Sequence, residues 1–172
     1  DAAVPDWPGE IDFYRDLIGA HGGAHLDALE IACGTGRAAL RLAPYAGSLT
    51  GLDLSPELLA IARQKGREIP NVEWAQGDMR AFSLGRTFGL ALIPGHSFQF
   101  MLTPEDQLAC LEMIGRHLSN DGMLVVHLDH QDVGWLAGLL RNKDSPEETI
   151  RELTHPITGG RFRTRHTWVF EP

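Results

Sequence analysis

The chain has 172 residues, 43% of them hydrophobic, which suits one globular domain. Its formal net charge of −8 argues against nucleic acid as a partner, because phosphate binding needs clustered Lys and Arg. No stretch approaches the roughly 20 apolar residues of a membrane span, and the first residues lack a signal-peptide pattern, so the sequence predicts a cytoplasmic protein without a membrane partner. The two cysteines, Cys33 and Cys110, form neither a disulfide framework nor a zinc-binding spacing, and we expect both to be reduced.

Apolar runs alternate with helical patterns as far as residue 130, which is typical of βαβ units and a parallel sheet. The expected strands are Ala28 to Ala32, Leu49 to Asp53, Val72 to Ala75, Phe88 to Ile93 and Met123 to Leu128. The expected helices are Glu10 to Ile18, Ala38 to Leu42, Pro56 to Arg67, and one that runs from Pro104 to near Asn120. The sequence therefore predicts an α/β fold.

Two of these helices begin with the same signal. Ser55-Pro56-Glu57 and Thr103-Pro104-Glu105 each place a capping hydroxyl before a proline and an acid in the first helical turn. In the second helix, apolar residues recur at helical spacing, and we expect this face to pack on the sheet. These residues are Leu108, Leu111, Ile114 and Leu118.

Beyond Leu128 the pattern weakens. Val133 to Leu140 fits a helix, and Asn142 to Glu148 is polar and fits a turn region. Arg161 to Phe170 alternates between apolar or aromatic residues and arginines, which predicts a strand of an antiparallel kind.

A glycine-containing segment directly follows the first expected strand. It reads Glu30-Ile-Ala-Cys-Gly-Thr-Gly-Arg37 and opens into the next helix. Glycines here let the backbone turn sharply and let a ligand come close. Gly34, Gly36 and Ala39 also satisfy the G-x-G-x-x-A form of a dinucleotide fingerprint, so an NAD-dependent oxidoreductase is an alternative.

Two further acids follow the next two strands. Asp53 ends the second strand, where a carboxylate can accept hydrogen bonds from both hydroxyls of a ribose. Asp78 follows the third strand and can accept from an exocyclic adenine amine while Met79 packs on the ring. A dinucleotide site has no standard need for this acid. With Glu30, these acids predict a ligand site at one edge of the sheet.

These segments resemble the motifs of class I S-adenosylmethionine-dependent methyltransferases that act on small molecules. Glu30 to Arg37 is similar to their first motif, Gly51-Leu-Asp-Leu-Ser-Pro-Glu57 to their second and Gln76-Gly-Asp-Met-Arg80 to their third. The resemblance implies a Rossmann-like open parallel sheet in the order 3-2-1-4-5, flanked by helices, with a C-terminal antiparallel strand or lid element. It also implies S-adenosylmethionine as cofactor and a nitrogen or oxygen of a small molecule as methyl acceptor. A cofactor-binding module without turnover is a further alternative.

The resemblance also implies roles for single residues. Gly34 and Gly36 would flank the methionine part of the cofactor, and Glu30 would order the loop. Asp53 would hold the ribose, and Asp78 with Met79 the adenine. The other cofactor-binding residues that it implies are Tyr14, Ala32, Cys33, Arg37, Leu54, Ile93 and Gly95.

His96 follows the fourth strand and is the candidate general base. The alternative is a histidine that shapes the pocket and moves no proton. Its segment, Ile93-Pro-Gly-His-Ser97, lacks the Asn/Asp-Pro-Pro-aromatic motif of enzymes that methylate nucleobase or amide nitrogens. It also lacks the acid of metal-dependent catechol-type enzymes. We expect no metal, although His127, Asp129 and His130 are ligand-type side chains.

We interpret residues 1–172 as a single methyltransferase-like domain, with a cofactor-binding core over 1–130. Residues 131–172 would form a partial substrate or lid region that is cut short. Met123 to Leu128 would then lie at an open sheet edge, which invites pairing with another strand. Arg161 to Phe170 is the internal candidate for this pairing. If it is a lid instead, we expect a homodimer.

Overall fold

The computed structural model describes residues 7–130, 133–134, 137, 148–154 and 161–167. The chain divides into two compact units. One is Trp7–Leu128, and the other comprises Asp1–Asp6 and Asp129–Pro172. That the whole chain forms a single domain stays a prediction.

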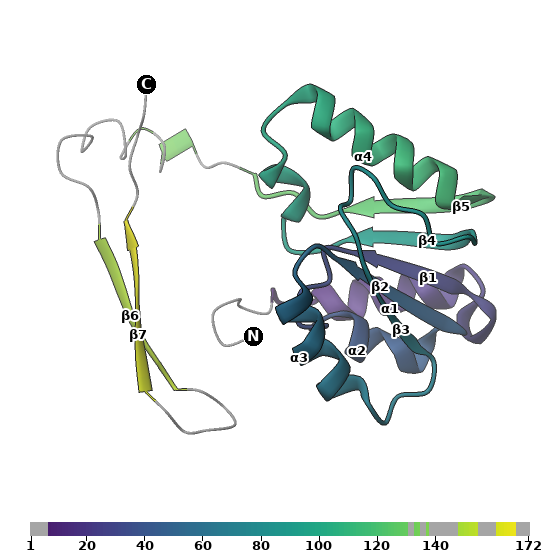
Figure 1. The fold of residues 1–172 in the computed structure, drawn as a ribbon, viewed down its shortest axis with the longest axis horizontal. Helices are drawn as coiled ribbons and strands as arrows, with labels where there is room; N and C mark the ends of the chain where they lie inside the picture. The colour runs from purple at the N-terminus through teal and green to yellow at the C-terminus, as the bar shows by residue number, and fades with distance from the viewer. Residues whose placement is uncertain (1–6, 131–132, 135–136, 138–147, 155–160, 168–172) are drawn as a thin grey trace. The chain divides into compact units, whose positions relative to one another are not determined.

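A five-stranded parallel sheet forms the centre of the unit Trp7–Leu128 (Figure 1). The strand order is β3-β2-β1-β4-β5, and every neighbouring pair is parallel, so the predicted order is confirmed. The order reverses between β1 and β4, and open α/β sheets bind ligands outside the carboxyl ends of such strands. The strands are β1 (Asp27–Ile31), β2 (Ser48–Asp53), β3 (Val72–Gln76), β4 (Phe88–Ile93) and β5 (Leu118–Val126).

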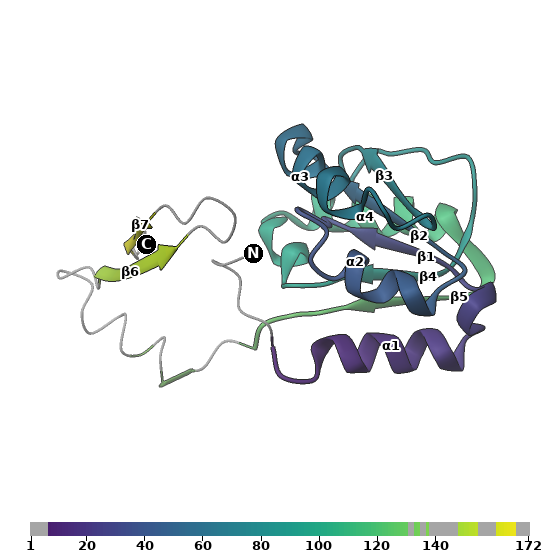
Figure 2. The ribbon, with the colours of Figure 1, turned by 90° about the horizontal axis from the view of Figure 1, so that it is seen from below.

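Helices cover both faces of this sheet. On one face, α1 (Glu10–Ala20) and α2 (Ala39–Leu42) bury Tyr14, Ile18 and Leu42 against the strands. Figure 2 shows α1 running along the sheet on the same side as α2. On the other face, α4 (Pro104–His117) buries Cys110 and Ile114. The fourth helix, α3 (Pro56–Gly66), packs beside β2 and β3.

The helix starts follow the sequence signals. The Ser55 hydroxyl accepts a hydrogen bond from the Leu58 N–H at 3.2 Å, and the Thr103 hydroxyl accepts one from the Asp106 N–H at 3.2 Å. A proline stands at the start of both helices, where its missing N–H leaves no intrahelical bond unmade. Both predicted caps are confirmed.

The buried face of α4 agrees with the expected one only in part. Leu108 and Leu111 are 59% and 39% exposed. Ile114 is buried as predicted, and the other buried residues of the helix are Cys110 and His117. His117 stacks on Phe82 and accepts a hydrogen bond from the Leu84 N–H at 3.1 Å, which fixes the end of the helix.

The helix also ends earlier, and β5 begins earlier, than predicted. Leu118 opens β5 and pairs with Phe88, whereas the sequence predicted a helix to near Asn120 and a strand from Met123. The β4–β5 pairing shifts register between Phe88 and Leu90, and this irregularity accommodates the added strand residues.

The described part of the second unit contains β6 (Glu148–Thr154) and β7 (Arg161–Thr167), which pair antiparallel in a two-stranded sheet. The strand partner of β7 is therefore β6. The expected C-terminal antiparallel strand in the main sheet is not confirmed, because β5 itself is parallel. The expected helix over Val133 to Leu140, the turn after Asn142 and the end of the predicted strand at Phe170 lie mostly outside the described residues.

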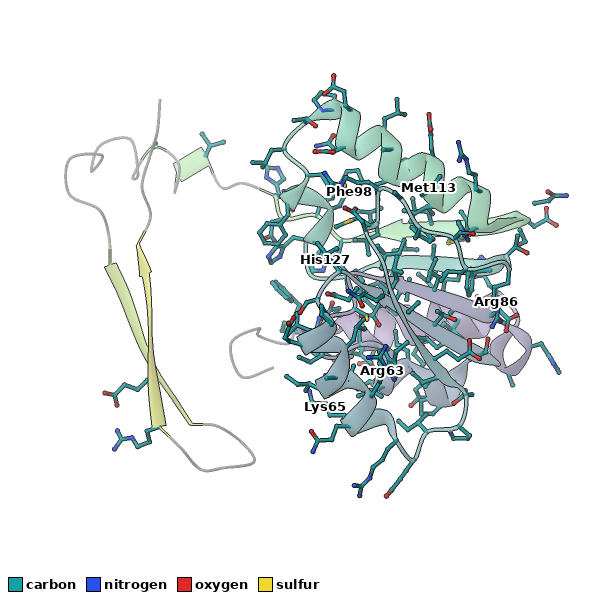
Figure 3. All side chains as sticks on the ribbon, in the orientation of Figure 1. Arg63, Lys65, Arg86, Phe98, Met113 and His127 are labelled. Carbon is teal, nitrogen blue, oxygen red and sulfur yellow. The ribbon has the colours of Figure 1, made fainter. Side chains whose placement is uncertain are left out.

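At the amino ends of the strands, Arg86 joins three strands of the sheet. Its guanidinium lies 2.8 Å from Asp27 of β1 and 3.7 Å from Glu73 of β3, and it donates a hydrogen bond to the Ser48 hydroxyl of β2 at 2.9 Å. Figure 3 shows Arg86 at the end of the sheet away from His127. Across the residues that the structure describes, no helix is long and apolar enough to cross a bilayer.

Candidate functional site

The loop after β1 contains three residues in the left-handed region: Ala32 with φ 56°, Gly34 with φ 55° and Gly36 with φ 76°. A Cβ added to Gly36 would lie 2.5 Å from the ring of Trp74, so packing alone excludes a side chain there. A Cβ added to Gly34 would meet no atom within 4 Å. Gly34 therefore borders open space that a ligand can enter.

Asp53 links this loop to the end of β2. Its Oδ2 accepts a hydrogen bond from the Gly34 N–H at 2.7 Å, and its Oδ1 accepts one from the Ser55 N–H at 2.9 Å. A carboxylate has about four acceptor positions. Asp53 therefore shapes the loop and keeps acceptor capacity for the hydroxyls of a ligand.

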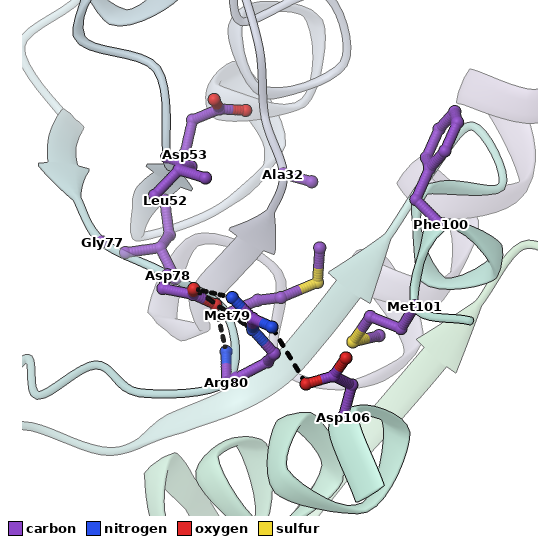
Figure 4. A pocket seen from close by; sticks show the side chains of 11 residues that line it. Ala32, Leu52, Asp53, Gly77, Asp78, Met79, Arg80, Phe100, Met101 and Asp106 are labelled. Carbon is purple, nitrogen blue, oxygen red and sulfur yellow. Dashed lines mark hydrogen bonds and ion pairs between the residues drawn. The ribbon is translucent and has the colours of Figure 1, made fainter. Parts of the chain in front are cut away.

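A pocket of about 270 Å³, which we call the rim pocket, opens at the carboxyl ends of the strands (Figure 4). Five of its lining residues were predicted as cofactor residues: Ala32, Asp53, Leu54, Asp78 and Met79. Sequence reasoning missed Phe100 and Met101, which come from the region between β4 and α4, and Asp106, which lies in the first turn of α4. No sequence motif marks these three, because only the fold brings them to β2 and β3.

An ion-pair network crosses one wall of the rim pocket. Arg80 donates to both oxygens of Asp78, with 2.6 Å between Nη2 and Oδ2, and to Oδ1 of Asp106 at 2.9 Å. These hydrogen bonds from Arg80 hold the pKa values of both carboxyl groups below their usual range. Arg80 stands in the predicted third motif, yet its partner on α4 is not visible in the sequence.

Glu30 and Cys33 lie beneath the loop rather than on a pocket surface. They are 3% and 4% exposed. The Glu30 carboxyl group accepts a hydrogen bond from the Ala39 N–H, and its Oε2 has no hydrogen-bond partner in the described part of the chain. Burial raises the pKa of Glu30 to about 8, and burial also raises the pKa of the Cys33 thiol.

Arg37 points to the N-terminal helix. Its Nη1 and Nη2 donate to Oε2 and Oε1 of Glu10 at 2.8 and 3.0 Å. The Nδ1 of His127 lies 3.8 Å from Oε1 of Glu10. Tyr14, one turn along the helix, is 3% exposed, and burial followed by the charge of Glu10 raises its pKa to about 12. Sequence reasoning selected Arg37 and Tyr14 but not Glu10.

A second pocket, of about 430 Å³, lies between the start of α1 and the end of β5. We call it the α1 pocket. Its walls include Trp7, Phe13 and Tyr14 from the N-terminal side and His127 from the other, with Glu10 as an acid. Aromatic walls with few polar groups are typical of small-molecule sites.

His96 lies between the two pockets and has φ 54°. Its ring centroid is 5.7 Å from that of Trp7, which lines the α1 pocket, and 6.1 Å from that of Phe100, which lines the rim pocket. Two other residues were predicted here. Ile93 ends β4 and is fully buried, Gly95 follows the strand and has φ 62°, and neither lines either pocket. Over the described residues, no cluster of His, Cys, Asp and Glu suits a metal ion.

Comparison with known proteins identifies the family. A family model described as a methyltransferase domain matches residues 28–122, which is more than half of the chain and includes both the loop after β1 and the acids after β2 and β3. The chain belongs to the methyltransferase-domain family. The methyltransferase domain thus coincides with the part of the chain that carries the rim pocket.

Three relatives of this methyltransferase domain are informative. The dTDP-3-amino-3,6-dideoxy-alpha-D-glucopyranose N,N-dimethyltransferase of Streptomyces fradiae is 35% identical over 121 residues, which cover 67% of this chain and 46% of the relative. Streptomyces venezuelae DesVI has a TM-score of 0.72 and 25% identity, with 95% of this chain and 64% of DesVI covered. The glycopeptide N-methyltransferase MtfA in complex with S-adenosyl-L-methionine has a TM-score of 0.58 and 25% identity, with 92% and 66% covered.

The chain spans 46% of the first of these relatives and 64% of DesVI. This chain therefore matches only part of the length of each relative. The methyltransferase-domain match supports the interpretation as a methyltransferase over the alternative of an NAD-dependent oxidoreductase. The sheet order fits both kinds of enzyme.

Proposed function

We propose that this chain is the cofactor-binding part of an S-adenosylmethionine-dependent methyltransferase whose acceptor is a nitrogen of a small molecule. The position of His96 carries the proposal. Its ring contacts Phe100 of the rim pocket and Trp7 of the α1 pocket, so a cofactor in the first and an acceptor in the second would meet at this side chain.

The residues present fit the cofactor. The space beside Gly34 is open, Asp53 keeps acceptor positions, and the buried Oε2 of Glu30 has no hydrogen-bond partner in the described part of the chain. When bound, S-adenosylmethionine supplies an electrophilic methyl group on a sulfonium. We propose that Asp53 holds the ribose, that Asp78 and Met79 hold the adenine, and that the remaining contacts come from Tyr14, Glu30, Ala32, Cys33, Gly34, Gly36, Arg37, Leu54, Ile93 and Gly95.

The names of the relatives favour nitrogen over oxygen as the acceptor. The Streptomyces fradiae relative is named for N,N-dimethylation of a nucleotide-linked amino sugar, and MtfA is named as an N-methyltransferase. We propose a nucleotide-linked amino sugar as the first acceptor class to test, held in the α1 pocket. His96 would act there as general base for a protonated amine. Its alternative role is to shape the junction of the pockets.

Calorimetry with S-adenosylhomocysteine and with NAD, each titrated into the full chain, tests the cofactor. We expect binding of the first and none of the second. Methyl transfer from labelled S-adenosylmethionine to a dTDP-linked amino sugar, with the corresponding hydroxyl sugar as control, tests the acceptor. Binding of S-adenosylhomocysteine without transfer to any amine would favour a module without turnover.

His96→Gln separates the two roles of this histidine. Loss of a general base should lower kcat by about 100-fold or more, and this loss should shrink at high pH because the amine then deprotonates in solution. A changed KM with an unchanged kcat would instead assign His96 to shaping the pocket.

Other features of the proposal rest on the sequence. The net charge of −8 supports a small-molecule partner rather than nucleic acid, and the free cysteines Cys33 and Cys110 support the cytoplasm as location.

We also propose that residues 1–172 form one methyltransferase-like domain, with 131–172 as its lid region, and that the chain forms a homodimer through the edge of β5. We expect catalysis without a metal.

A further inference from the structure

His127 lies at the carboxyl end of β5, where it lines the α1 pocket (Figure 3). Its backbone N–H donates a hydrogen bond to the carbonyl oxygen of Ile93 at 3.0 Å, which continues the β4–β5 pairing past Val126. The imidazole ring lies edge-on to the ring of Trp7, with 5.1 Å between the centroids. The sheet and Trp7 therefore hold this ring in place at the wall of the pocket.

The two nitrogens of the His127 ring have different surroundings. Nδ1 is buried and has no hydrogen-bond partner among the residues that the structure describes. It lies 3.8 Å from Oε1 of Glu10, which is too far for a hydrogen bond. The side chain as a whole is nevertheless 22% exposed. Because Nδ1 is buried, Nε2 is the ring nitrogen that a ligand in the α1 pocket can reach.

Glu10 favours one tautomer of this ring. Its carboxylate is 4% exposed and is held by both terminal nitrogens of Arg37, at 2.8 and 3.0 Å. A carboxylate oxygen only accepts hydrogen bonds, so it favours a proton on the imidazole nitrogen that faces it, which is Nδ1. In that tautomer Nε2 carries a lone pair, and it accepts a hydrogen bond from a donor on the ligand.

His127 meets a different group of the acceptor than His96 does. Both rings contact Trp7, with centroid distances of 5.1 Å for His127 and 5.7 Å for His96. His96 also contacts Phe100 of the rim pocket, whereas His127 lines the α1 pocket and not the rim pocket. An acceptor whose amine lies at His96 thus presents a second group to His127. Because both histidines contact the same indole ring, these two groups are close together, as on neighbouring carbons of one sugar.

We propose that His127 determines the acceptor specificity of the α1 pocket by accepting a hydrogen bond at Nε2 from a hydroxyl next to the amine. The preferred acceptor is then an amino sugar with adjacent amino and hydroxyl groups. The proposal rests on the proposed function, because it assumes that the acceptor occupies the α1 pocket. A deoxy sugar places a C–H group against Nε2 and displaces water from it, so the nitrogen loses a hydrogen bond without replacement.

Two dTDP-linked amino sugars test this inference when they are identical except at one carbon next to the amine, which carries a hydroxyl in one sugar and only hydrogen in the other. Each sugar is titrated by calorimetry into the full chain saturated with S-adenosylhomocysteine. We expect the wild type to bind the hydroxylated sugar about tenfold or more tightly than the deoxy sugar.

His127→Phe keeps a ring against Trp7 but has no nitrogen. It should reduce the preference to about threefold or less, and the loss of affinity should fall on the hydroxylated sugar. His127→Gln places an amide near the position of Nε2, and its oxygen accepts a hydrogen bond, so this variant should keep part of the preference.

The control is His25→Phe, since His25 is an exposed histidine just before β1 that lines neither pocket. This variant should keep the wild-type preference, and all variants should bind S-adenosylhomocysteine as the wild type does. Equal affinities of the wild type for the two sugars, or an equal loss for both sugars in His127→Phe, would overturn the inference while the proposed function stands. Failure of the wild type to bind S-adenosylhomocysteine, or to bind either sugar, would overturn the proposed function and this inference with it.

Discussion

Glu10 of α1 and Arg37 of the loop after β1 form a bidentate ion pair, with side chains that are 4% and 15% exposed and N–O distances of 2.8 and 3.0 Å. The pair connects the N-terminal helix to the loop that borders the ligand site. Because the pair is largely shielded from water, each of its two charges is stabilised in the folded protein by the opposite charge of the other.

Glu10→Ala should lower the free energy of unfolding by about 3 kcal/mol, because it removes the bidentate carboxylate from a guanidinium that is only 15% exposed. Urea denaturation followed by circular dichroism measures this. The double variant Glu10→Met with Arg37→Met removes both charges and should be more stable than Glu10→Ala. If Glu10→Ala costs less than about 1 kcal/mol, the pair behaves as an exposed one and the connection is weak.

The pH dependence of stability should contain a contribution from Glu30. Burial raises its pKa to about 8 from the ordinary value of 4.5, so the folded protein binds a proton that the unfolded chain releases between these values. Stability from this group is therefore present below about pH 4.5 and is lost as pH rises toward about 8, at up to about 1.4 kcal/mol per pH unit.

Glu30→Gln should remove this slope. Urea denaturation of the wild type and of the variant at several pH values between 5 and 8 gives the difference in slope directly. Parallel curves for the two proteins would show that the carboxyl group is already ionised in the folded state.

The two loop glycines should respond differently to alanine. Gly36→Ala places a Cβ 2.5 Å from the Trp74 ring at φ 76°, so it should lower stability by about 3 kcal/mol or more. Gly34→Ala meets no neighbour and should cost only about 1 kcal/mol for its left-handed backbone. Its methyl group would occupy ligand space, however, and should weaken S-adenosylhomocysteine binding by about tenfold or more. Equal effects of both variants on melting temperature and affinity would contradict this division.

The corrected face of α4 can be tested with one matched pair. Ile114→Ala should cost about 2 to 5 kcal/mol because Ile114 is 1% exposed, whereas Leu108→Ala should change stability by less than about 1 kcal/mol because Leu108 is 59% exposed. Thermal melts of the two variants decide the matter. A larger loss for Leu108→Ala would show that Leu108 is buried, as the sequence predicted.

The helix caps were predictable because their signals are local, whereas the strand order followed from the resemblance to a known family. A capping hydroxyl, a proline and an acid stand next to one another at Ser55 and at Thr103, and each acts within one helical turn. The acids at Asp53 and Asp78 were placed correctly at the carboxyl ends of the strands for the same reason, since Asp53 ends β2 and Asp78 comes two residues after the end of β3.

The face of α4 was not predictable, because its sequence offers two overlapping apolar stripes. Leu108, Leu111 and Ile114 belong to one stripe, and Cys110 and Ile114 belong to the other, so the two stripes share Ile114. Only the position of the helix on the sheet selects between them. The partners of Arg37 and Arg80 were hidden for a similar reason: they lie 27 and 26 residues away, and no spacing rule connects them.

Ala32 and His96 are the two residues other than glycine with a positive φ in the described part of the chain, and each follows one of the strands between which the sheet order reverses. A left-handed conformation costs such a residue about 1 to 2 kcal/mol, a cost that glycine avoids. Variants selected only for thermal stability would therefore gain from glycine at both positions. Under the proposed function, variants selected for catalysis would keep the His96 imidazole and accept the strain. At this edge of the sheet, the two kinds of selection favour different residues in the same sequence.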